Sequence, residues 1–113
     1  MEIISQTTTV NDLKRMAAGM FISLVKAVVD VRRGIIAVDA ELHSDLEAGL
    51  LADGSKQEDI WGINFYPDKQ GDDFIEFDSM INVRPSCNNL SRGVDSQETR
   101  RKIMDVVSKR IMR

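Results

Sequence analysis

The sequence contains one cysteine, one histidine, one tryptophan and one tyrosine among its 113 residues. Cys87 alone cannot form an internal disulfide, so the chain suits a reducing compartment and we expect it in the cytoplasm. One histidine, His43, is too few for most zinc sites, which commonly combine more than one His or Cys. The scarcity of aromatic residues argues against an RNA-recognition sheet. We therefore predict no metal and no cofactor.

Long hydrophobic runs are also missing, so the sequence predicts no membrane-spanning segment. The start MEIISQTTTV has no basic segment followed by an apolar one, which argues against a signal peptide. The formal net charge of −3 argues against non-specific binding to nucleic acid. The run Asp53-Gly54-Ser55-Lys56 follows no glycine-rich stretch and is not a P-loop. The composition does not identify the partner, which could be a protein or a small anionic ligand.

The composition is that of a folded chain, with 42% hydrophobic and 29% charged residues. A length of 113 residues fits one hydrophobic core, so we expect residues 1–113 to form a single α+β domain.

The first half of the chain predicts a helix followed by a β-hairpin. Thr9 and Asp12 form a capping box, and apolar residues then recur at helical spacing, the last of them Met20, so we expect a helix over 10–19. β-Branched residues predict a strand over 24–31, and a short turn leads to a return strand over 35–38.

Residues 44–52 are ambiguous. Ser44 and Glu47 fit a second capping box, and Gly54 could end a short helix in the left-handed conformation. Alternatively, Asp53-Gly54 is the turn of a hairpin. Good helix formers in this stretch favour the helix.

The second half predicts two strands and a helix. Residues 60–66 alternate as a strand, and residues 74–84 read as one long strand or two strands joined at a bend, stopped by Pro85. Asp95 and Glu98 predict the cap of a last helix with a basic outer face. We expect a two-layer sandwich in which a four- to five-stranded, mainly antiparallel sheet carries the N- and C-terminal helices on one face. The other face would stay at least partly wet.

Alternation along the last two strands gathers polar side chains on one side of the sheet. This predicted binding face comprises Asn64, Tyr66, Glu76, Asp78, Asn82 and Arg84. Arg84 could hold a carboxylate or phosphate through its planar fork, and Asp78 or Glu76 could act as a base or bind a hard cation. The alternative is an ordinary solvated sheet face with weak cross-strand pairs.

Two further clusters are candidates. Glu41, His43 and Asp45 would face one way on an extended strand, which suits a single metal ion, although a carboxylate–histidine pair is also a common structural feature. Asn88, Asn89 and Arg92 lie in a loop rich in donors that could hold an anion beside Arg84, or could satisfy its own backbone. Cys87 has no activating neighbour in the sequence.

Several runs resemble a family of small prokaryotic proteins described only as a domain of unknown function. They are VKAVVDV (25–31), ELH (41–43), DGSKQEDIWGIN (53–64) and IEFDSMINVRP (75–85). The resemblance extends over nearly the whole chain, and it implies no activity and no role for any residue.

Three hypotheses for the function follow. The first is a non-enzymatic binding or interaction domain that uses the polar sheet face. The second is a small hydrolase or nuclease with Asp78, Arg84 and either His43 or Glu41 at its centre. The third is a nucleic-acid-associated regulator that uses the basic C-terminal helix.

Overall fold

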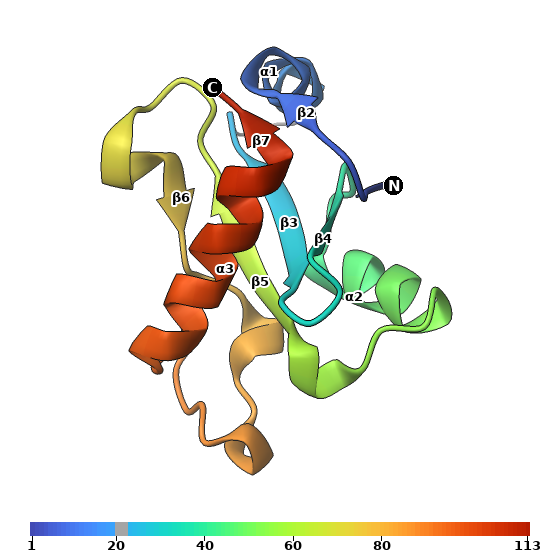
Figure 1. Cartoon of the computed structure of the whole chain (residues 1–113), viewed down its shortest axis with the longest axis vertical. Helices are drawn as coiled ribbons and strands as arrows, with labels where there is room; N and C mark the ends of the chain where they lie inside the picture. Colours follow the sequence, from blue (N-terminus) through green and yellow to red (C-terminus); the bar gives the residue numbers. More distant parts are fainter. Residues whose placement is uncertain (20–22) are drawn as a thin grey trace.

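The computed structural model describes residues 1–19 and 23–113. Its main sheet has five strands, and every neighbouring pair is antiparallel. In spatial order these strands are β1 (Glu2–Ile4), β4 (Ile35–Val38), β3 (Val25–Asp30), β5 (Ile60–Phe65) and β6 (Ile75–Glu76). A separate parallel pair joins β2 (Thr8–Thr9) to β7 (Ile111–Met112), close to both termini (Figure 1).

The helices are α1 (Val10–Ala18), α2 (His43–Ala52) and α3 (Gln97–Arg110) in the described residues. Short 3-10 helices occupy the connections, namely η1 (Gln57–Asp59), η2 (Gly71–Phe74), η3 (Met80–Asn82) and η4 (Pro85–Cys87). The α+β class and the antiparallel sheet predicted from the sequence are confirmed.

The predicted cap of α1 is confirmed, whereas the caps predicted for the other two helices are wrong. The Thr9 hydroxyl accepts the backbone N–H of Asp12 at 3.1 Å, and the Asp12 carboxylate accepts the N–H of Thr9. α2 is a helix rather than half of a hairpin, but its N-cap is Leu42, which makes no side-chain capping bond. Ser96 caps α3. Met20, the last residue of the predicted α1 pattern, lies outside the described residues.

One face of the sheet packs against α1 and α3. Val25, Ala27 and Val29 of β3 stand opposite Phe65, Ile63 and Trp61 of β5, and all of them are buried. They share a core with Leu13 and Ala17 of α1 and with Ile103, Val106 and Val107 of α3. Figure 1 shows α3 running across the sheet in front of β3 and β5. The predicted placement of the helices is confirmed in part, since α1 and α3 share this core whereas α2 lies on the other face.

The opposite face is covered by α2, so the prediction of a partly wet second face is wrong for this part of the sheet. Leu46 and Leu50 of α2 pack with Val28, Ala37 and Ile60, which point away from the first core because strand side chains alternate. Every residue of β4 is buried. A continuous apolar strand is typical of a sheet covered on both faces, and this signal was present in the sequence.

The long strand predicted over 74–84 is also wrong. Pairing with β5 stops after Glu76, and the chain continues through η3 and η4. Ser79 crosses over Gly62 so closely that a Cβ added to Gly62 would lie 2.5 Å from the Cβ of Ser79. The glycine in the middle of β5 thus provides the space through which the segment after β6 passes.

This close approach predicts that Gly62→Ala destabilises the fold. The added methyl group overlaps Ser79, and such overpacking costs about 1–3 kcal/mol of unfolding free energy. Urea denaturation of the variant and the wild type measures the loss. Gly19→Ala is the control, because its added Cβ would meet only ordinary van der Waals contact. Equal stability of the two variants would contradict the packing of Ser79 against Gly62.

Candidate functional site

Beyond β6 the edge of β5 is closed by a side chain rather than by a strand. Asn82 donates from Nδ2 to the Gly62 carbonyl at 2.9 Å, and its Oδ1 accepts the Gly62 N–H at 2.8 Å. The same Nδ2 donates to the carbonyl of Arg92 at 3.0 Å. The buried carboxamide therefore imitates a neighbouring peptide group and ties the returning loop to the sheet.

The buried side chain of Arg84 binds backbone carbonyl groups at the start of β5 and just before it. Its guanidinium donates to the carbonyls of Ile60, at 2.6 Å, and Gln57, and it lies over the Trp61 ring. Burial is the main cause that lowers the pKa of Arg84. With 8% of its surface exposed and two carbonyls engaged, Arg84 points into the fold. The sequence-based argument for an anion at Arg84 therefore has no support from its position.

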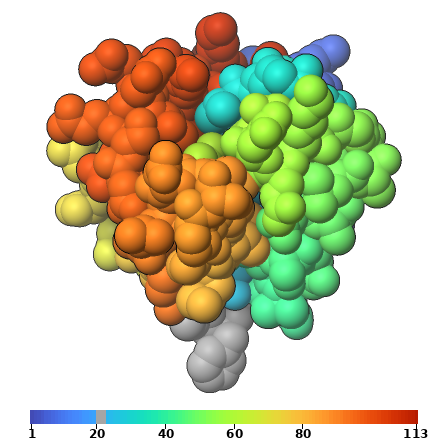
Figure 2. All heavy atoms as spheres, turned by 90° about the horizontal axis from the view of Figure 1, so that it is seen from below, coloured from blue at the N-terminus to red at the C-terminus, as the bar shows by residue number. Residues whose placement is uncertain are grey.

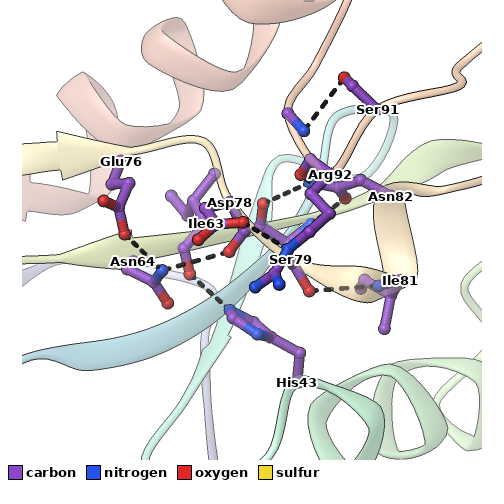
Figure 3. Close-up of polar contacts among 12 residues, drawn as sticks. His43, Ile63, Asn64, Glu76, Asp78, Ser79, Ile81, Asn82, Ser91 and Arg92 are labelled. Atoms are coloured by element: carbon purple, nitrogen blue, oxygen red, sulfur yellow. Dashed lines mark hydrogen bonds and ion pairs between the residues drawn. The ribbon is translucent and has the colours of Figure 1, made fainter.

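The other four residues of the predicted face come together at the β5–β6 end of the sheet. Asn64 donates from Nδ2 to Glu76 Oε1 at 2.9 Å and to the Asp78 carbonyl at 3.2 Å. The Tyr66 hydroxyl donates to the same Glu76 oxygen at 3.0 Å. Burial, followed by the hydrogen bond to Glu76, raises the pKa of Tyr66, so the phenol keeps its proton. Figure 3 shows Asn64 between Glu76 and His43.

His43 begins α2 and reaches down to the sheet. Its Nε2 lies 2.8 Å from the Ile63 carbonyl, which can only accept, so this nitrogen carries the proton. Burial is the largest cause that lowers the pKa of His43, and the charge of Lys26 also lowers it. In the neutral ring Nδ1 is then the hydrogen-bond acceptor.

His43 and Asn64 line a groove of about 260 Å³ between the start of α2 and the segment from Asp78 to Ile81. Its polar lining consists of Lys26, His43, Ser44, Asn64, Asp78, Ser79 and Arg92. Its apolar lining consists of Leu24, Leu42, Met80 and Ile81. In Figure 2 the α2 region (green) and the segment after β6 (orange) meet along a furrow on the face of the molecule seen from below.

The charges in the groove are unevenly paired. Arg92 Nε binds Asp78 Oδ1 at 2.7 Å, which neutralises both groups (Figure 3). Lys26 is half-buried and has no acidic partner within salt-bridge distance in residues 1–19 and 23–113. Asn64 Oδ1 is buried and, within the same residues, accepts no hydrogen bond. Buried groups of this kind normally have a partner.

The secondary candidates are separated by the fold. His43 lies in the groove, whereas Glu41 and Asp45 are exposed. A helix rather than an extended strand begins at His43, so residues 43 and 45 point in different directions. The described part of the chain holds no group of three or more His, Cys, Asp or Glu residues that could bind a metal ion.

The loop after β6 mostly satisfies its own backbone. The buried Asn89 donates to the carbonyls of Asn82, Ser91 and Gly93, and it accepts the N–H of Asp95. Asn88 adopts a left-handed conformation with φ of 56° at the end of η4. Arg92 is the one residue of the predicted loop cluster that lines the groove.

Sequence reasoning did not single out Lys26, Leu42 or Met80. Lys26 had a usable signal, since it is the one charged residue among the first five of the strand VKAVVD. Leu42 and Met80 had no such signal in the sequence, because an isolated apolar residue in a loop is common on protein surfaces.

The fold and the groove define a class of protein: an antiparallel α+β sheet with helices on both faces and a small polar groove beside the second helix. The chain belongs to the family described as "Protein of unknown function (DUF5674)", whose model matches residues 2–110. No curated protein and no solved structure matches the chain. In the described ranges, none of the helices has the length and apolar character needed to cross a membrane.

The role of Asn82 predicts that Asn82→Asp destabilises the protein. The carboxylate can accept from Gly62 N–H but cannot donate to the Gly62 and Arg92 carbonyls. We expect a loss of at least about 2 kcal/mol of unfolding free energy, measured by urea denaturation at neutral pH. Asn88→Asp is the control, because Asn88 is exposed and aspartate tolerates the left-handed conformation. Similar stability of the two variants would refute the bridging role of Asn82.

The environment of His43 predicts a pH-dependent stability. The pKa of His43 in the folded protein lies below the 6.5 of a free histidine, so the unfolded chain binds the proton more readily. Its neutral form therefore supports the fold fully above about pH 6.5, and this contribution is lost as the pH falls below that value. Urea denaturation should show a larger loss between about pH 7.5 and about pH 5.5 for the wild type than for His43→Gln. An equal loss of stability in the wild type and in His43→Gln would contradict a role of His43 in this pH dependence.

Proposed function

We propose that the protein is a non-enzymatic binding domain that holds a small anionic ligand in the groove between α2 and the segment after β6. The observation that carries this proposal is Lys26, which lines the groove and has no acidic partner among the described residues. A half-buried cation interacts more strongly with an anion than an exposed one does, because less water screens the pair.

The remaining charges of the groove favour an anion. Lys26 and Arg92 contribute two positive charges and Asp78 one negative charge, while His43 is neutral at pH 7, which leaves one net positive charge. Glu76 lies nearby, but it does not line the groove and it accepts hydrogen bonds from Asn64 and Tyr66. The Nδ1 atom of His43 adds an acceptor for a donor group on the ligand.

The size of the groove limits the ligand. Drug-sized molecules and cofactors occupy about 300–1,000 Å³, and this groove measures about 260 Å³. It suits one small molecule.

The geometry gives less support to the two rival hypotheses. A hydrolase or nuclease centred on Asp78, Arg84 and His43 needs all three around one cavity, and Arg84 does not line the groove. Two of the basic side chains of α3 that the sequence placed on its outer face are bound to backbone carbonyls of the protein itself. Arg100 donates to the Val94 carbonyl, and Arg110 donates to the Gly34 carbonyl.

Titration with acetate and with inorganic phosphate, followed by NMR of the amide signals, tests this proposal. We expect at least one of the two anions to shift the signals of Lys26, His43 and Asn64. Lys26→Met should weaken this binding about tenfold or more, since a charged hydrogen bond contributes about 1.5–3 kcal/mol.

Lys109→Met is the matched control, because Lys109 is exposed on α3, on the other side of the sheet. It should bind the anion like the wild type. Binding that survives Lys26→Met unchanged, or an absence of any shift with both anions, would refute the proposal.

A further inference from the structure

Two exposed apolar side chains line the same groove as Lys26. Leu42 is 53% exposed just before α2, and Met80 is 65% exposed at the start of η3. They come from the two segments that border the groove. The groove therefore combines a cation with apolar walls, which is typical of small-molecule sites.

The position of Leu42 is unusual for a leucine. It is the N-cap of α2, where serine, threonine, aspartate or asparagine would satisfy a free backbone N–H. Leucine forms no such bond, and half of its surface faces solvent, so neither helix capping nor the core explains it. Because it lines the groove, this side chain is available for contact with an apolar part of a ligand.

We propose that the ligand is a short-chain aliphatic carboxylate, whose carboxylate binds Lys26 and whose alkyl chain lies between Leu42 and Met80. This inference rests on the proposed function, because it names the class of ligand that the same groove holds. A free acid fits better than a peptide, since the groove of about 260 Å³ has room for a small molecule.

The charge of the groove selects a carboxylate over a phosphate. Arg92 is bound to Asp78, so Lys26 is the one unpaired cation of the described lining. One net positive charge matches a singly charged carboxylate. A phosphate carries up to two charges and three acceptor oxygens at neutral pH, and it would need further donors.

Calorimetric titration of the whole chain with acetate, butyrate and hexanoate tests this inference. Each added methylene group that becomes buried should tighten binding about threefold to fourfold. Butyrate should therefore bind about tenfold more tightly than acetate, and hexanoate more tightly again.

Leu42→Ser and Met80→Ser should each reduce the gain in affinity with chain length, so that hexanoate affinity falls more than acetate affinity. Both side chains are exposed, so the fold tolerates the changes. Leu90→Ser is the control, because Leu90 is 73% exposed and does not line the groove. It should retain the full dependence on chain length.

The outcomes separate the two proposals. Equal affinities for acetate and hexanoate, or Lys26-dependent binding of phosphate but not of carboxylates, would overturn the inference and leave the proposed function standing. Binding of no anion would refute both. A peptide ending in leucine is the remaining comparison. If it binds more tightly than hexanoate and loses affinity when its C-terminus is amidated, the ligand is a peptide and the inference of a free acid is overturned.

Discussion

The pair of hydrogen bonds between the Asn82 carboxamide and the Gly62 peptide group is the interaction on which the site depends. A strand edge inside a protein must be paired, because unpaired backbone groups are costly when buried. Here β6 pairs with β5 only at Asn64 and Phe65 of β5. Further along β5, the Asn82 side chain takes the place of a strand at Gly62. The glycine allows Ser79 to pass close by, and Asn82 then fixes the loop against β5. Together they bring the segment from Asp78 to Ile81 over the same face of the sheet as α2.

The groove results from two segments that approach the same face of β5 from different directions. α2 contributes His43, which is anchored to the Ile63 carbonyl, and the returning loop contributes Asp78 and Arg92, which neutralise each other. Lys26 is left as an unpaired cation in the described lining, and exposed apolar residues stand on both sides. The hydrogen bonds that Asn82 and Arg84 make to β5 and the residues before it keep both side chains buried and out of the groove lining.

The predictions from the sequence that proved wrong have a common physical origin. The alternation over 74–84 was real, but alternation shows only that a segment is extended and half-buried, and it does not show what the segment pairs with. Glu76 and Asp78 lie near Asn64, because the predicted pairing exists between the last two residues of β5 and the first residues of the segment predicted as a strand over 74–84. Asn82 and Arg84 lie beyond the point where pairing stops, so their positions follow the loop instead. In the same way, a favourable cap sequence at Ser44 did not determine where α2 begins.

The sequence by itself determined the α+β class, the family, the hairpin of β3 and β4, and the apolar faces of α1, α3 and β5. The fold class, the hairpin and the apolar faces follow from local propensity and from the periods of helix and strand, which neighbouring residues set. The family follows from the match over residues 2–110. Only the tertiary structure decided that α2 covers the second face, that Arg84 turns inward and that Lys26 has no acidic partner in the described residues. Those outcomes depend on contacts between residues far apart in the chain. The apolar run of β4 indicated that both faces are covered, but a local pattern does not show which segment covers them.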